Sequence, residues 1–175
     1  MLLASGSVSA QAALIERSEI RFSSREPGAR VEGSFRRWKA NVDFRPHDLA
    51  GSKADLQIEL SSIDLANKAA VALLVRPRWF DTARFPVATF ASNDIRRVSG
   101  DRYEFAGTLS LKGVSREVVM PVVVRKDVSG NNVAEGRLTF KRLDFKLGDG
   151  QQHADGVAAD DVAVRVRMVL PAVVA

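Results

Sequence analysis

The most regular feature of the chain is an alternation of apolar and polar residues with a period of two. In the clearest run, residues 162, 164, 166, 168 and 170 are apolar, whereas Arg165 and Arg167 hold the other parity. Successive side chains of a β-strand point to opposite faces of a sheet, so this pattern predicts half-buried strands. Alternating runs occupy residues 19–23, 30–36, 40–45, 54–60, 102–112 and 162–170, and apolar stretches between turn residues predict further strands at about 87–92, 116–125 and 135–142.

Eight or nine strands without intervening helices predict an all-β domain, either an antiparallel barrel or a sandwich. We favour a barrel of about eight strands, because the strands are long and the inward set includes five phenylalanines. One short helix is expected from about Leu65 to Val75, capped by Asp64 or a neighbouring serine and ended by Pro77. Its run from Ala69 to Val75 leaves almost no polar face, so it should lie against the barrel, cover the barrel mouth, or touch a partner or lipid.

Composition narrows the class of protein. The 175 residues suit one folded domain, and 46% hydrophobic residues argue against disorder. The absence of cysteine excludes thiol catalysis, cysteine-rich zinc sites and iron–sulfur clusters. Lys and Arg number 26 against 21 Asp and Glu, a net charge of +5, which fits either an anionic partner or a basic outer face.

The first twelve residues carry no charge and end in Ala10-Gln11-Ala12, a small-x-small pattern that signal peptidase cleaves after. We therefore expect residues 1–12 to be a truncated secretory leader. The alternative is an ordinary small-residue terminus, since there is no basic n-region and the apolar core is shorter than the roughly 7–15 residues of a leader. No later apolar run reaches the roughly 20 residues of a membrane span.

Five motifs occur in one order along the chain. Residues 79–90 read WFDTARFPVATF and are similar to an FFD…YP…TF signature; residues 103–118 read YEFAGTLSLKGVSREV and are similar to a GxLTIKGVTKxV hairpin. VEGSF at 31–35, ID at 63–64 and LDFKLG at 143–148 also match. Together these motifs resemble the YceI-like family of lipid- or polyisoprenoid-binding proteins. The domain is assigned to residues 18–171.

The resemblance implies a lipocalin-like β-barrel, periplasmic or secreted in bacteria, that holds a long apolar chain: a polyisoprenoid, an isoprenoid quinone or a fatty-acid derivative. It implies binding, sequestration or carriage without catalysis, with no cofactor other than the lipid. One departure from the family is the apolar run Ala69 to Val75, where a charged, polar helix is common. This run raises the alternative of a membrane- or partner-associated module, in stress response or beside a respiratory-chain partner, that uses the helix and the basic surface.

The candidate ligand contacts are the apolar residues that face the inside of the predicted barrel, together with residues of the predicted helix and of the junction after it. Trp79 and Phe80 at that junction are either gatekeepers or core anchors, and the whole set could equally fill the barrel with side chains. The candidates are Ile20, Phe22, Val31, Phe35, Val42, Phe44, Leu56, Ile58, Leu74, Trp79, Phe80, Phe90, Phe105, Leu109, Phe140, Val164 and Val166.

Basic clusters at 36–39, 76–79, 96–97 and 141–142 could meet a diphosphate headgroup or an anionic membrane, or simply form the outer face. Of these, Arg37, Arg76 and Arg78 are the candidates for contact with a lipid headgroup. Nucleic acid is not expected, because acidic residues are dispersed among the basic ones. The two histidines, His47 and His153, lack a second histidine at metal spacing, and no nucleophile elbow or P-loop occurs, so neither a metal site nor a catalytic residue is expected. A monomer or a homodimer is expected.

Overall fold

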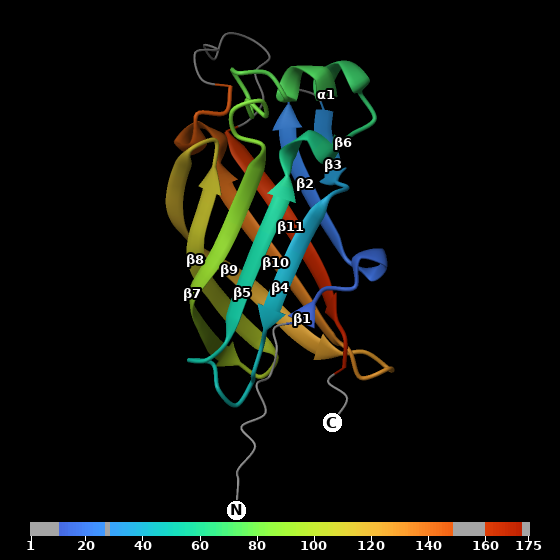
Figure 1. The fold of residues 1–175 in the computed structure, drawn as a ribbon, viewed down its shortest axis with the longest axis vertical. Helices are drawn as coiled ribbons and strands as arrows, with labels where there is room; N and C mark the ends of the chain where they lie inside the picture. The colour runs from blue at the N-terminus through green and yellow to red at the C-terminus, as the bar shows by residue number, and fades with distance from the viewer. Residues whose placement is uncertain (1–10, 27–28, 149–159, 173–175) are drawn as a thin grey trace, which may run out of the picture.

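The computed structural model of this chain describes residues 11–26, 29–148 and 160–172. In this part of the chain, one antiparallel 11-stranded sheet curls strongly into a half-barrel, and helix α1 (Lys68–Leu74) lies across one end (Figure 1). The strands are β1 (Gln11–Ala12), β2 (Glu19–Glu26), β3 (Ala29–Phe35), β4 (Trp38–Asp43), β5 (Lys53–Glu59), β6 (Ile63–Asp64), β7 (Val87–Ser99), β8 (Arg102–Leu111), β9 (Val114–Lys126), β10 (Asn132–Lys141) and β11 (Asp161–Leu170).

The strands are ordered β1-β4-β5-β7-β8-β9-β10-β11-β2-β3-β6. Strands β3 and β4 follow each other in the chain but lie near opposite ends of this order, so the bend at residues 36–37 carries the chain from one edge of the sheet to the other. The amide of Arg36 donates to the Ser62 carbonyl at 3.1 Å, and the Leu14 amide donates to the Val169 carbonyl at 2.8 Å. The first bond extends the pairing of β3 with β6 at one edge, whereas the second joins the segment after β1, at the other edge, to β11, so the curled sheet has an enclosed inner face.

The all-β prediction is confirmed, and all nine predicted strands are present with shifted ends. The strands added by the structure, β1 and β6, have two residues each, too few to show a period. Helix α1 is shorter than predicted, and its expected cap is wrong: the side chain of Asn67, not Asp64, accepts from the amides of Ala69 and Ala70. Asp64 instead binds Arg36.

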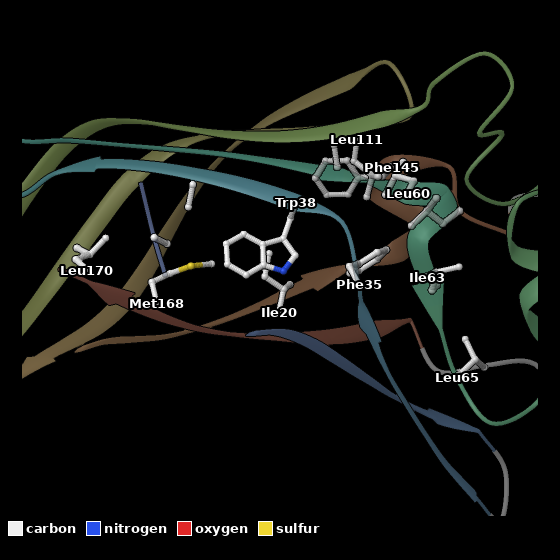
Figure 2. Close-up of a cluster of buried hydrophobic side chains, with 14 residues drawn as sticks. Ile20, Phe35, Trp38, Leu60, Ile63, Leu65, Leu111, Phe145, Met168 and Leu170 are labelled. Atoms are coloured by element: carbon white, nitrogen blue, oxygen red, sulfur yellow. The ribbon is translucent and has the colours of Figure 1, made fainter. Parts of the chain in front are cut away.

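The core follows the inward parity of the strands. Ile20 is fully buried, and Trp38, Met168 and Phe35 pack along the same inner wall (Figure 2). A second cluster around Ile95, Tyr103 and Phe105 fills the end of the half-barrel away from α1. Between these packed regions and α1 the inner face is not filled by side chains, and this is where the candidate site lies.

Candidate functional site

An apolar cavity of about 270 Å³ lies inside the curled sheet beneath α1. Its wall is built by the inward residues of the long strands, and α1 contributes Ala70, Leu73 and Leu74. Ser24, Asn67, Thr89 and Arg142 are the polar side chains among the described residues that line it. Such a wall disfavours a small hydrated solute and favours hydrocarbon, because burying each CH₂ group is worth about 0.8 kcal/mol.

A second apolar cavity of about 60 Å³ continues from the first towards the far end of the half-barrel. The two cavities share four lining residues, Leu56, Phe90, Met120 and Val166. Sites for drug-sized ligands usually enclose roughly 300–1,000 Å³. The two connected cavities together lie at the lower end of this range, which leaves room for one slender chain.

Aromatic rings shape both ends of this space. The Phe22 and Phe35 ring centroids are 5.5 Å apart, and Phe80 meets Phe35 edge-on at 6.4 Å, so residues from β2, β3 and the segment after α1 form one wall. At the far end, Phe44 stacks on Phe105 at 6.1 Å. Rings in these arrangements hold one another in place, so the walls are expected to be stiff.

Most of the residues predicted to contact a ligand reach one of the two cavities. The exception is Ile20, which is fully buried in the core and lines neither cavity. The larger cavity is lined by Phe22, Val31, Phe35, Leu56, Ile58, Leu74, Trp79, Phe80, Phe90, Leu109, Phe140, Val164 and Val166, and the smaller one by Val42, Phe44 and Phe105, together with the shared residues. Their contact with a ligand remains a prediction.

The three arginines predicted to meet a headgroup lie away from these walls. Arg37 is on the outer face, where its Nε donates to Glu59 Oε2 at 2.8 Å and its Nη2 to Oε1 at 2.9 Å. This double hydrogen bond raises the pKa of Arg37 and lowers the pKa of Glu59. Arg76 and Arg78 are exposed just beyond α1. Contact of any of the three with a headgroup stays a prediction.

Arg142 lines the cavity, although it belongs to a basic cluster that was predicted to lie on the outer face. It is 2% exposed, its Nη1 donates to the Leu147 carbonyl at 2.7 Å, and its guanidinium lies 5.6 Å from the centre of the Trp79 ring. Its parity is that of Phe140, so strict alternation pointed inward. The same signal would have found Leu60, Leu111, Met120 and Leu138, which continue the inward parity of their strands and line the cavity.

Clusters of metal-ligating side chains are absent from the part of the chain that the structure describes. No three His, Asp or Glu side chains there are close enough to hold a metal ion. His47 is exposed in a loop, and His153 lies outside the described residues. No helix in the described ranges is long and apolar enough to cross a membrane. The apolar cavity is therefore the feature on which a functional assignment has to rest.

Comparison with known proteins agrees with the geometry. The sequence matches the YceI-like domain over residues 13–170, nearly the whole chain. The chain belongs to the YceI-like family. Protein YceI of Escherichia coli O157:H7 is 26% identical over 132 residues, 70% of this chain and 69% of that protein. A UPF0312 protein of Yersinia pestis is 30% identical over 88 residues, half of this chain and 45% of its own length.

Solved structures of this YceI-like type share the architecture. Burkholderia cenocepacia BcnA superposes with a TM-score of 0.85 and 29% identity, over 90% of this chain and 98% of that one. A polyisoprenoid binding domain from Saccharophagus degradans, implicated in plant cell wall breakdown, gives a TM-score of 0.73 over 94% of this chain and 99% of that one. Because its identity is only 20%, it shows the shared fold alone.

Proposed function

We propose that this YceI-like protein binds a long-chain lipid inside the half-barrel and sequesters or carries it without catalysis. The observation that supports this most directly is the apolar cavity of about 270 Å³ that continues into a second one. The candidates are a polyisoprenoid, an isoprenoid quinone and a fatty-acid derivative. The Saccharophagus degradans domain of the same fold is described as polyisoprenoid binding, which favours the two isoprenoid classes. The lipid is the only bound group that the proposal requires.

Native mass spectrometry of the purified protein, followed by solvent extraction, tests this proposal. We expect one long-chain lipid per protein, and uptake of a polyprenol or a ubiquinone by the stripped protein. A protein that is purified without lipid and takes up neither compound would contradict the proposal.

Cavity-filling variants connect binding to the cavity itself. Ile58→Trp and Val164→Trp enlarge side chains that line opposite walls, whereas Val87→Trp makes a similar change at an exposed position. We expect the two cavity variants to lose lipid stoichiometry while Val87→Trp keeps it. Since overpacking costs about 1–3 kcal/mol, thermal unfolding is recorded in parallel to confirm that each variant is folded.

A partner-binding role for α1 is the second candidate, favoured by the 42% exposure of Leu73. Replacing Leu73 and Leu74 by serine separates the two functions. Loss of liposome or partner binding with unchanged lipid content would favour the second candidate. Loss of lipid would favour the cavity, which both side chains line.

We further propose that the protein acts in the bacterial periplasm or outside the cell. Residues 1–10 of the leader lie outside the described residues, and Gln11–Ala12 form β1, so cleavage after Ala12 would remove that strand. Expression in a bacterial host with fractionation and N-terminal sequencing tests this: we expect periplasmic protein that begins at Ala13. Uncleaved protein confined to the cytoplasm would contradict it.

A further inference from the structure

The sheet is interrupted between β9 and β10. Strand β10 pairs with β11 along its whole length, Asn132 to Lys141, but it pairs with β9 only over residues 132–136, opposite residues 122–126. Ladder pairing is thus absent between residues 117–121 of β9 and residues 137–141 of β10, which the same register would place opposite each other, and we call this stretch the β9–β10 seam.

The seam begins at a residue that cannot extend the ladder. The Val124 amide donates to the Asp101 carbonyl at 2.9 Å, on the β8 side. Hydrogen-bonding groups alternate between the two neighbours of an antiparallel strand, so those of residues 123 and 121 point towards β10. Residue 121 is Pro121, which has no N–H to donate, and ladder pairing with β10 ends just before it.

The seam leads into the larger cavity. Met120 on one side of it, and Leu138 and Phe140 on the other, are partly exposed and line that cavity. Nearer α1, the two sides are joined by long side chains: Lys112 Nζ donates to the Lys146 carbonyl at 2.9 Å, and Arg116 Nη2 to the Asp144 carbonyl at 3.5 Å. Side chains move aside more readily than a hydrogen-bonded ladder, so this is a weak line in the wall.

The outer face beside the seam carries a row of like charges. Arg137 lies opposite Arg165, and Arg165 lies opposite Arg21, on the adjacent strands β10, β11 and β2. Like charges directly opposite each other destabilise a sheet. Arg21 has Glu19 at 3.8 Å, but among the described residues Arg137 and Arg165 form no ion pair. The row is thus poorly compensated within the chain and complementary to an anionic surface.

Apolar surface lies among these charges. The three arginines and Pro121 line one open hollow of about 640 Å³ in the outer face, where five arginines outnumber three glutamates in the lining. Val98, which also lines it, is 57% exposed. Val119 of the seam is 50% exposed. Cations around exposed apolar side chains are typical of surfaces that lie against anionic lipid headgroups.

From these features we infer that the face formed by β9, β10, β11 and β2 docks on an anionic phospholipid bilayer, and that the lipid chain enters the cavity sideways through the β9–β10 seam. A bilayer fits better than an acidic protein, because the same face offers a route for hydrocarbon into the cavity. The entry step rests on the proposed function, since it requires a chain that binds inside; the docking step can be measured without any bound lipid.

Docking is tested by co-flotation with vesicles of phosphatidylcholine containing phosphatidylglycerol. The variant Arg137→Gln/Arg165→Gln removes two cations without leaving a carboxylate unpaired, and Lys39→Gln/Lys53→Gln makes the same charge change on β4 and β5. We expect the arginine variant to bind at least about ten-fold more weakly and the lysine variant to bind as the parent does. Equal losses in both variants, or binding that is as strong to phosphatidylcholine alone, would overturn the docking. Retention on an acidic protein column with no vesicle binding would also overturn it.

The seam is tested by crosslinking, which is clean because the chain has no cysteine. Val119→Cys/Thr139→Cys places thiols on the two sides of the seam, and Thr139→Cys/Ala163→Cys places them across a fully paired ladder. After reaction with a short bis-maleimide, we expect uptake of nonaprenol from vesicles to slow at least about ten-fold in the seam variant only. An unchanged rate would overturn entry through the seam, while unchanged equilibrium binding of cis-parinaric acid would show that the cavity itself still works. No binding of either lipid by the parent would contradict the proposed function and the entry route together.

Discussion

At the scale of single residues, Gly107 shows how closely the backbone packs where β7 bulges against β8. A methyl group at Gly107 would collide with the Ala91 carbonyl oxygen and lie 2.8 Å from Ser92 Cα, both backbone atoms beside the register shift at Ser92/Asp94. Gly136 offers a matched position, since there a methyl group would meet the flexible end of Met120.

We therefore expect Gly107→Ala to lower the free energy of unfolding by about 3 kcal/mol, at the upper end of overpacking costs, and Gly136→Ala by less than about 1 kcal/mol. Urea unfolding of the two variants measures the difference. Equal effects would show that the backbone at the bulge can shift as easily as a methionine side chain.

Asp127 is the residue whose titration should be most visible in stability. The Asn131 side chain, together with Arg17 and the amides of Asn131 and Ser129, lowers its pKa from 3.8 to about 2 in the folded protein. A folded-state pKa below the unfolded one means that the charged carboxylate stabilises the fold above about pH 4, and that this contribution is lost as the pH falls from about 4 to about 2.

The urea midpoint of the parent should thus fall more steeply between pH 4 and pH 2 than that of Asp127→Asn. The variant still declines somewhat, because Glu59, Asp64, Asp101 and Glu117 also have lowered pKa values and lose their charge in acid. Parallel curves for the two proteins would rule out the assigned role of Asp127.

At the scale of elements, the N-terminal segment shows which strand is dispensable. Deleting residues 1–12 removes β1 and its pairing with β4, but the Ala13 amide still donates to the Ala40 carbonyl at 3.2 Å and the Leu14 amide to Val169 at 2.8 Å. We expect a folded protein that is less stable by about 1 kcal/mol. Its Tm should be about 2–4 °C lower in calorimetry. An insoluble or unfolded product would show that β1 is essential for closing the sheet.

The pattern of apolar and polar residues predicts a strand only where the strand is long enough for the pattern to repeat. Alternation predicts six of the strands, and apolar stretches between turn residues predict three more. The predicted β7 ends near Ser92, because the bulge at Ser92/Asp94 shifts the inward parity from Phe90 to Ile95. Alternation misses β1 and β6 because two residues have no period. The predicted helix begins at Leu65, directly after Asp64, which excludes Asn67 as its cap; in the structure Asp64 instead pairs with Arg36 and Lys68.

At the scale of the whole molecule, the alternation of apolar residues predicts which side chains form the inner wall, but it does not predict how much empty volume they enclose. The side chains of Phe22 and Ile20 share one face of β2, yet one lines the cavity and the other is fully buried, because their distances from α1 differ. Whether inward side chains meet or leave a space depends on the curvature of the sheet. Curvature arises from register, bulges and the bend at residues 36–37, none of which alternation reports.

The same cavity predicts that stability depends on its occupant. Any ligand that binds only the folded state adds RT ln(1 + [L]/Kd), about 2.7 kcal/mol at a hundred-fold excess over Kd. Stripping the lipid by extraction should therefore lower the Tm, and adding a polyprenol back should restore it. An identical Tm before and after stripping would indicate a cavity that is normally empty.

The pairing of β2 with β11 determines when the sheet can finish folding. This ladder joins residues 19–24 to residues 162–167, so β2 can pair with β3 early but keeps its other side unpaired until residues 162–167 have been synthesised. Contacts so distant in sequence make folding slow, on the order of milliseconds to seconds. For that interval the inner wall faces water, and a hydrocarbon chain present during folding could be enclosed as the last strand docks. Lipid captured in this way would report where the protein was made, so ligand identity is best compared between protein folded in cells and protein refolded without lipid.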